Sequence, residues 1–406
     1  MKFPLLVRIL IAITLGVLLG MFVPTIVVRG MNTLCGIFDQ LLKFLIPLII
    51  VGLVTPAIAD VGRGAGKMLV ITALMAYGAT VLSGLFSYVC SINLFPAIID
   101  THQALTLSSE GTKFAPYFTI EIPPIMPVMT ALVLSFLLGL GIAFFGKEGL
   151  KKGFDEFKDI VTLAIERVII PLLPFYVFGL FLDMSAAGQV GAVLLAFLKV
   201  IVIIFLLTAI LLLMQYTVAG IITRRNPLRL LMTMLPAYFT ALGTSSSAAT
   251  IPVTLRQTIR NGVDENVAGF VIPLCATIHL SGSTLKIVAC AIAIMLLQGT
   301  DESILGSVAP SNELVLGSVA PSPFDFPLML GFILMLGITM IAAPGVPGGA
   351  IMAALGILSS ILGFNSDQQA MMITLYIAMD SFGTACNVTG DGAIALIMDK
   401  LRRRDK

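Results

Sequence analysis

The chain has 406 residues, of which 58% are hydrophobic and only 11% are charged, and its mean hydropathy is +1.05. Soluble domains carry ~25% charged residues, so this composition predicts an integral membrane protein and excludes a cytosolic enzyme and a secreted disulfide scaffold. The net charge of +2 gives no basic field that would attract polyanions, which argues against a nucleic-acid partner.

Apolar stretches long enough for membrane helices recur along the chain, since one crossing takes about 20 residues. Uncharged stretches of that length cover residues 9–28, 68–99, 122–146, 200–223, 230–255 and 326–366. Shorter stretches beside a charge cover residues 44–59, 168–182 and 267–285, and a further segment fills the last 40 residues. We expect the first stretch to be a retained span, because it is longer than the apolar part of a signal peptide and lacks a cleavage site.

Two of these stretches are interrupted in a way that predicts re-entrant hairpins. The first contains GTSSSAATIP at residues 243–252, and the second contains APGVPGGA at residues 343–350. Backbone that leaves a helix at membrane depth must lie in protein or in a watery cavity, not in lipid. A pair of interrupted segments in corresponding positions of two halves is typical of a transporter binding site.

Basic residues orient the predicted spans, because they favour the cytoplasmic side. They cluster at residues 147–158, 224–229 and 400–406, whereas residues 298–325 hold no basic residue. This alternation predicts eight spans in the cell membrane with both termini cytoplasmic. The loops alternate consistently between the two sides only if neither hairpin crosses the membrane. The serine hairpin would then enter from inside and the Gly/Pro hairpin from outside. A repeated LGSVAPS, at residues 305–311 and 316–322, is interpreted as a duplication that lengthens an outer loop.

The last span carries the densest polar pattern. Thr384, Asn387 and Asp391 follow Asp380 by 4, 7 and 11 residues, so all four share one face of a continuous helix. Ionisable groups inside a membrane generally mark functional sites that face a cavity. Carboxylate and amide oxygens suit an alkali cation or a substrate ammonium. The structural alternative is an ion pair between helices, although this helix has no basic residue before Lys400.

Two further polar groups are candidates. Ser245, Ser246 and Ser247 lie at the first hairpin tip, where hydroxyls and free N–H groups suit an anion. In the seventh span, His279 and Lys286 are seven residues apart and are predicted to share a face, with Thr277, Ser281 and Ser283 nearby. A lone histidine is more often a hydrogen-bonded core residue than a ligand. Lys286 either snorkels or acts in function.

At these residues the sequence resembles the dicarboxylate/amino acid:cation symporter family, the glutamate transporter homologues. The matching motifs are TSSSAATIPVTL (244–255), ATIHLSGST (276–284), APGVPGGAIM (343–352) and NVTGD (387–391). The resemblance implies an all-α polytopic fold of eight transmembrane helices and two re-entrant helical hairpins, working as an elevator in a homotrimer. Residues 1–62 and 120–185 would form the scaffold with helices 1–2 and 4–5. Residues 63–99 and 186–406 would form the transport domain with helices 3 and 6–8, hairpin 1 at about 227–261 and hairpin 2 at about 326–363.

The resemblance also implies roles for single residues. Asp380 would hold a substrate amino group, Asn387 would meet the substrate carboxylate, and Asp391 would ligate sodium. The full implied substrate set is Ser245, Ser246, Ser247, Ser283, Lys286, Val346, Gly348, Asp380, Gly383, Thr384 and Asn387. The full implied cation set is Cys275, Thr277, His279, Met340, Ile341, Ala343, Asn387 and Asp391.

The sequence departs from the family pattern at two places. The family's NMDGT motif is HLSGS here, so His279 replaces an Asn and Ser281 replaces the Asp of a third sodium site. Gly383 stands where the acidic-amino-acid transporters carry an Arg for a side-chain carboxylate. Lys286 stands close to where that Arg would lie. We hypothesise that Lys286 restores a cation for a second carboxylate or replaces a bound ion.

These observations predict a secondary active symporter that imports a small amino acid or dicarboxylate. We favour an amino acid as the substrate, because Asp380 would repel a dicarboxylate. We favour sodium as the coupling ion. We expect no other cofactor and no transition metal. The alternative is a proton-coupled dicarboxylate symporter that uses His279. Two other classes are an intramembrane serine hydrolase, which would also need His279, and a passive channel. The chain contains neither GxSxG nor HExxH.

Overall fold

The computed structural model describes residues 5–63, 67–99, 114–145, 148–188, 190–297, 322–343 and 347–404, and this part of the chain is helical without strands. Six helical stretches among these residues are long and apolar enough to cross a membrane. The protein is therefore a multi-pass helical membrane protein, as the composition predicts. The expected number of eight spans stays a prediction.

One group of helices comes mainly from the N-terminal half of the chain. It contains α1 (Leu5–Gly20), α2 (Thr25–Arg63), α5 (Val128–Phe145), α6 (Glu148–Ala164) and α7 (Ile170–Ala186), with a π-helical turn at Ile165–Ile169. Helix α2 packs against α5, α6 and α7, and α1 packs against α7. The last contact is close because Gly20 has no side chain. A Cβ there would stand 2.6 Å from the Leu182 carbonyl oxygen and the Ser185 Cβ.

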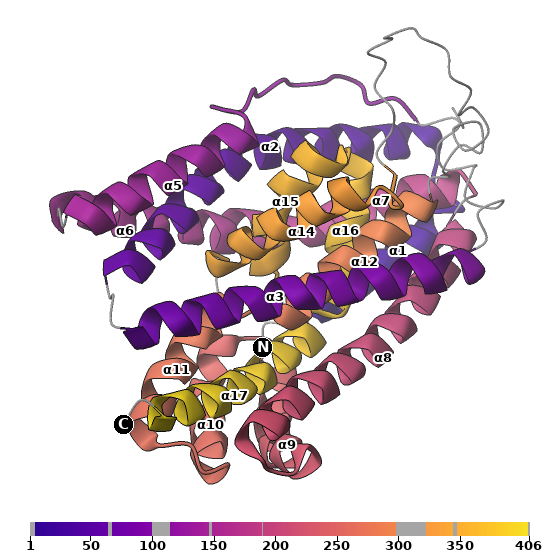
Figure 1. The fold of residues 1–406 in the computed structure, drawn as a ribbon. Coiled ribbons are helices and arrows are strands. Elements are labelled where there is room, and N and C mark those ends of the chain that lie inside the picture. Colours follow the sequence, from indigo (N-terminus) through magenta and orange to yellow (C-terminus); the bar gives the residue numbers. More distant parts are fainter. Residues whose placement is uncertain are drawn as a thin grey trace, which may run out of the picture.

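The second group surrounds the C-terminal helix. It contains α3 (Lys67–Leu94), α8 (Val190–Thr223), α9 (Pro227–Thr244), α10 (Ser247–Arg260), α11 (Glu265–Ile278), α12 (Ser281–Leu297), α14 (Phe326–Ile341), α15 (Gly349–Leu362), α16 (Ser366–Ala378) and α17 (Asp380–Arg404). Helices α8 to α12 all contact α17, and α3 lies along α12 (Figure 1). Every residue of α12 is buried, so this helix forms the centre of the group.

Both interrupted stretches form helix pairs. Helices α9 and α10 pack against each other around Ser245, which adopts a left-handed conformation with φ of 50°, and Ser246, which is extended. Helices α14 and α15 also pack against each other. Part of the second tip, including Val346, lies outside the described residues, and so does the LGSVAPS repeat apart from Ser322.

The N-terminal spans differ from the sequence prediction. The stretch 9–28 is not one helix, because α1 ends at Gly20 and α2 begins at Thr25, directly after Pro24. Proline lacks the N–H that a helix interior needs but fits the start of a helix. Helix α2 is also much longer than the predicted span 44–59, since it continues to Arg63 through two internal prolines.

The seventh and eighth spans are each broken once. His279 is extended, with φ of −107° and ψ of 96°, and separates α11 from α12. The prediction that His279 and Lys286 share a helix face is therefore wrong, because His279 lies in the break whereas Lys286 lies on α12. The last span breaks at Met379, so that Asp380 is the first residue of α17. A carboxylate there is favoured by the positive end of the helix dipole.

Candidate functional site

The polar residues of α17 form a buried row that faces α12 and the break before it. Asp380, Thr384, Asn387 and Asp391 are each at most 8% exposed. Because α17 is continuous from Asp380 onward, the predicted spacing holds and the four side chains share one face. The row extends over about 16 Å, at 1.5 Å per residue.

At the first end of the row, Asp380 has two partners that are far away in the sequence. Its Oδ1 lies 3.9 Å from the Lys286 Nζ, and its Oδ2 accepts a 2.8 Å hydrogen bond from the Gly348 N–H. Lys286 also donates to the Met379 carbonyl oxygen at 3.1 Å, and its Nζ lies 4.0 Å above the Tyr376 ring. Asp380 is thus joined both to a buried cation and to the second hairpin.

Gly383 provides the space that Lys286 fills. A Cβ at this position would collide with the Lys286 Cε and Nζ. This contact places Lys286 beside residue 383, as the resemblance to the symporter family implies. A larger residue at 383 and a lysine at 286 are therefore mutually exclusive unless the local packing changes.

In the middle of the row, Asn387 binds the start of α12. Its Oδ1 accepts from the N–H groups of Gly282 and Ser283, at 2.8 and 3.3 Å, and its Nδ2 donates to the Ser283 Oγ at 3.1 Å. The Ser283 Oγ also accepts from the Tyr376 hydroxyl at 3.0 Å. Thr384 uses its hydroxyl on the Asp380 carbonyl oxygen. The network explains how one asparagine fixes α17 against α12.

Tyr376 is a site residue that sequence reasoning missed. It is 1% exposed, contacts Lys286 through its ring and Ser283 through its hydroxyl, and lies on α16. The available signal was a tyrosine one helical turn before Asp380 in an otherwise apolar segment. That signal is weak, because buried tyrosines that satisfy their hydroxyl are common in protein cores.

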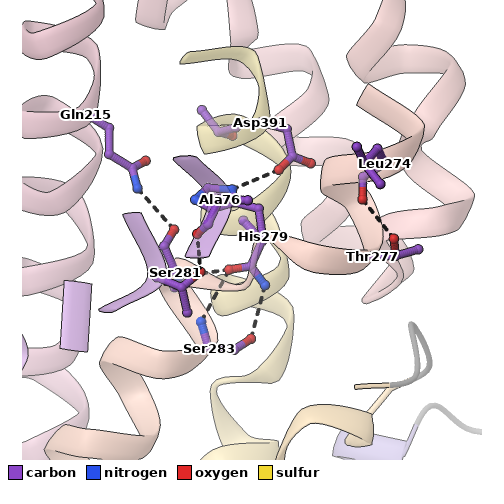
Figure 2. Close-up of polar contacts among 12 residues, drawn as sticks. Ala76, Gln215, Leu274, Thr277, His279, Ser281, Ser283 and Asp391 are labelled. Atoms are coloured by element: carbon purple, nitrogen blue, oxygen red, sulfur yellow. Dashed lines mark hydrogen bonds and ion pairs between the residues drawn. The ribbon is translucent and has the colours of Figure 1, made fainter. Parts of the chain in front are cut away.

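At the other end of the row, His279 and Asp391 form a sealed pair. The His279 Nδ1 lies 2.9 Å from the Asp391 Oδ1, and both side chains are at most 1% exposed (Figure 2). A neutral imidazole that donates from Nδ1 to an ionised carboxylate leaves Nε2 as an acceptor. Next to this pair, the Ser281 hydroxyl accepts from the Gln215 Nε2 at 3.1 Å, and the Ser281 carbonyl oxygen accepts from the Ser83 hydroxyl.

The other predicted cation residues are more scattered. Cys275 is buried, but Thr277 is exposed and uses its hydroxyl on the Leu274 carbonyl oxygen (Figure 2). Met340 and Ala343 lie buried at the end of α14, where the Ala343 N–H donates to the Met340 carbonyl oxygen at 3.3 Å, with Ile341 between them. In the described part of the chain, no cluster of three or more His, Cys, Asp and Glu could hold a metal ion.

The serines of the first tip begin the second half of hairpin 1. Ser245 ends α9, and the Ser246 Oγ accepts from the Ala249 N–H at 3.3 Å as the N-cap of α10. Ser247 is buried. Both helices of this hairpin pack against α17, so that both hairpins reach the helix that carries the polar row.

The hydrolase alternative needs a serine hydroxyl on the free nitrogen of a histidine whose other nitrogen binds a carboxylate. His279 has the carboxylate, but its Nε2 has no hydrogen-bond partner among the described residues. The neighbouring Ser281 hydroxyl accepts from Gln215 instead. A serine–histidine–aspartate triad is therefore not assembled in the part of the chain that the structure describes.

Comparison with known proteins points to a family of transporters. The model of the sodium:dicarboxylate symporter family matches residues 5–320 and 313–401. Excitatory amino acid transporter 1 of Homo sapiens is 27% identical over 316 residues, which are 73% of this chain and 52% of the relative. Excitatory amino acid transporter 3 of Mus musculus is 32% identical over 190 residues, which are 46% of this chain and 31% of the relative. The chain spans about half the length of the curated relatives it matches.

Proposed function

The chain belongs to the sodium:dicarboxylate symporter family, and on this premise we propose that it is a cation-coupled secondary active symporter for a small amino acid or dicarboxylate. The relatives named above are excitatory amino acid transporters, which supports a substrate of this chemical class. The import is driven by a cation gradient across the cell membrane and needs no other cofactor. Both termini lie on the cytoplasmic side.

The observation that carries this proposal is the bond between the second hairpin and the polar row. The Gly348 N–H, at the start of α15, donates to a buried carboxylate of α17 at 2.8 Å. The tip of hairpin 2 bonds directly to Asp380, the carboxylate that we propose binds substrate. Such a tip can close when substrate binds and open when substrate leaves. Coupling follows if substrate and cation both favour the same closed state.

The packing of the helices supports an elevator mechanism. In the first group, α2 contacts α5, α6 and α7, and α1 contacts α7. In the second group, α3 and α8 to α17 gather around α12 and α17. We assign the first group, residues 1–62 and 120–185, to a scaffold and the second, residues 63–99 and 186–406, to a transport domain. The scaffold forms the homotrimer, and the transport domain carries the site across the membrane.

The two ends of the polar row have separate roles in this proposal, substrate binding at Asp380 and sodium binding at Asp391. Asp380, Asn387 and Thr384, together with the two hairpin tips, bind substrate. Asp391 and Asn387 bind sodium, with Cys275, Thr277 and the end of α14 contributing to the cation sites. His279 occupies the place of an asparagine of the family motif, so its ring takes part of the volume that a cation shell would fill.

A second candidate, a proton-coupled dicarboxylate symporter, is favoured by the two groups that already face the Asp380 carboxylate. Lys286 faces one carboxylate oxygen and the Gly348 N–H binds the other. A substrate ammonium would have to displace a buried lysine, because two cations beside one carboxylate repel each other strongly at low dielectric. A substrate carboxylate, in contrast, is attracted by Lys286. His279 supplies a group that can carry a proton.

Uptake into proteoliposomes tests both candidates. The purified chain is reconstituted with an inward sodium gradient, a choline control and two pH gradients. Radiolabelled neutral amino acids, acidic amino acids and C4 dicarboxylates are then offered. Accumulation above equilibrium that needs sodium supports the sodium symporter, and accumulation that follows the proton gradient supports the second candidate. Equilibration without accumulation under every gradient would show a channel and contradict both.

A further inference from the structure

A cavity of about 370 Å³ opens between α3, α8 and α17, away from the Lys286–Asp380 pair. Leu82 of α3 and Met214 and Val218 of α8 line it and are 65%, 46% and 51% exposed, so they form its rim. In a membrane-spanning helix such exposed apolar residues face lipid. The cavity is therefore accessible from the bilayer.

Two residues that line this cavity each carry a buried polar atom without a partner. His279 and Gln215 both line the cavity, and the His279 Nε2 and the Gln215 Oε1 have no hydrogen-bond partner in the described structure. They lie close together. A Cβ on Gly390 would stand 2.6 Å from the Gln215 Oε1 and 2.8 Å from the His279 Cε1, the ring atom bonded to Nε2. Buried polar atoms without partners are rare, and each one needs an explanation.

The contacts on the other side of each side chain decide what the two atoms need. The His279 Nδ1 faces Asp391, so a neutral ring offers Nε2 as an acceptor (Figure 2). Gln215 donates through its Nε2 to the Ser281 hydroxyl, which leaves Oε1 as an acceptor. With the proton of a neutral His279 on Nδ1, both atoms are acceptors, and no donor among the described residues satisfies them. A Cβ at position 390 would clash with both side chains, so the glycine lets Gln215 and His279 pack closely against α17 here.

From this geometry we propose that the cavity binds a linear amphiphile from the membrane, whose single hydroxyl donates to His279 or Gln215. The other walls are mostly apolar, including Ala393, Ile394 and Phe86, and suit an alkyl chain. Water alone would leave these walls without contacts. A cavity of about 370 Å³ is large enough for a short alkyl chain.

This site adjoins the His279–Asp391 pair of the proposed transport function, but it is tested without transport. The full chain in phospholipid nanodiscs is illuminated with an alkyl diazirine of about ten carbons that ends in a hydroxyl. The matched probe is its methyl ether, which has no donor. Labelled peptides are identified by mass spectrometry. We expect the alcohol to label α3 and α8 about fivefold more than the ether, the factor that one hydrogen bond gives. Excess decanol competes, and decane does not.

Two variants locate the site. Val218→Trp fills the rim and should reduce labelling at least about fivefold, whereas Val202→Trp, on the equally exposed lipid face of α8 outside the cavity, leaves it unchanged. Gln215→Leu removes one of the two acceptors and should reduce the excess of alcohol labelling over ether labelling. Equal labelling by alcohol and ether in the native chain, or labelling that ignores Val218→Trp, overturns the proposal. Competition by a sterol in place of decanol overturns the linear occupant.

Discussion

The two carboxylates of α17 face basic partners in very different surroundings. Asp380 lies 3.9 Å from Lys286, its side chain is 11% exposed, and the tip of hairpin 2 binds its second oxygen. Asp391 lies 2.9 Å from His279, and both of these side chains are almost completely sealed. The first pair is loose and adjoins the tip of hairpin 2, which moves in the proposed mechanism. The second pair is tight, and its two side chains are more fully buried. The difference teaches that neighbours, rather than position on the helix, decide which carboxylate can exchange its partner.

Removing the tight pair should have the largest effect. Asp391→Ala leaves the buried His279 Nδ1–H without an acceptor and opens a void, and should destabilise the protein by about 3 kcal/mol. Thermal unfolding in detergent measures the loss, and uptake in proteoliposomes should fall to background. Glu156→Ala is the control, because Glu156 forms an exposed ion pair with Lys152 on α6, where a pair contributes about 1 kcal/mol or less. Equal losses in both variants would contradict the comparison.

Removing the loose pair should change substrate choice more than stability. Lys286→Met deletes the buried cation, so uptake of a dicarboxylate should fall about tenfold or more, while an amino acid can now place its ammonium against Asp380. Competition between succinate and neutral amino acids in the uptake assay measures the shift. Lys199→Met serves as the control, because Lys199 lies on α8 and donates to the Ile98 carbonyl oxygen instead of pairing with Asp380. An unchanged preference would remove the role given to Lys286.

Restoring the family motif should sharpen the difference between the ends of the row. His279→Asn combined with Ser281→Asp adds oxygen ligands beside Asp391 and removes the imidazole. We expect the half-saturating sodium concentration to fall about tenfold, roughly 1.4 kcal/mol in binding. Sodium titration of uptake measures it, and Ser281→Ala alone is the control. A sodium response that stays at the native level would show that the cation site lies elsewhere.

The smallest effect is expected from a helix cap that supports only the loose pair. Asn365 accepts from the Gln368 N–H and forms a capping box at the start of α16, the helix that carries Tyr376. Asn365→Ala should cost about 1 kcal/mol in thermal stability and weaken substrate binding slightly. Asn226→Ala removes the matching cap of α9 and should cost a similar amount without touching Lys286. Identical substrate affinity in both variants would show that the cap of α16 does not contribute to substrate binding.

Sequence reasoning recovered the features that depend on local pattern. The membrane class, the two interrupted helix pairs and the shared face of Asp380 and Asp391 follow from composition and spacing, and the structure agrees with them. The break at Met379 was missed because no glycine or proline marks it. Helix propensity alone is a weak guide to such a break, because tertiary context can override it.

The partners of the polar row could not be predicted from the row itself. Lys286 reaches Asp380 across 94 residues of sequence, and the last helix offers no basic residue nearby. The break at His279 also separates two residues that a continuous helix would have aligned. Helical spacing predicts neighbours on one element, whereas ion pairs between elements depend on the tertiary fold. Gln215, whose orphaned oxygen faces the lipid-side cavity, was missed for the same reason.

The unequal lengths of α1 and α2 make bilayer thickness a variable for this protein. At 1.5 Å per residue, the 16 residues of α1 extend over about 24 Å and the 39 residues of α2 over about 58 Å. A hydrocarbon core of ~30 Å matches neither helix. As a membrane span, helix α2 is longer than the hydrocarbon core, so it must tilt, protrude or thicken the bilayer around it, and each response has a free-energy cost. Helix α1 is shorter than any of the six stretches that are long enough to cross a membrane. Lipids with longer acyl chains therefore reduce the mismatch at α2 and increase it at α1.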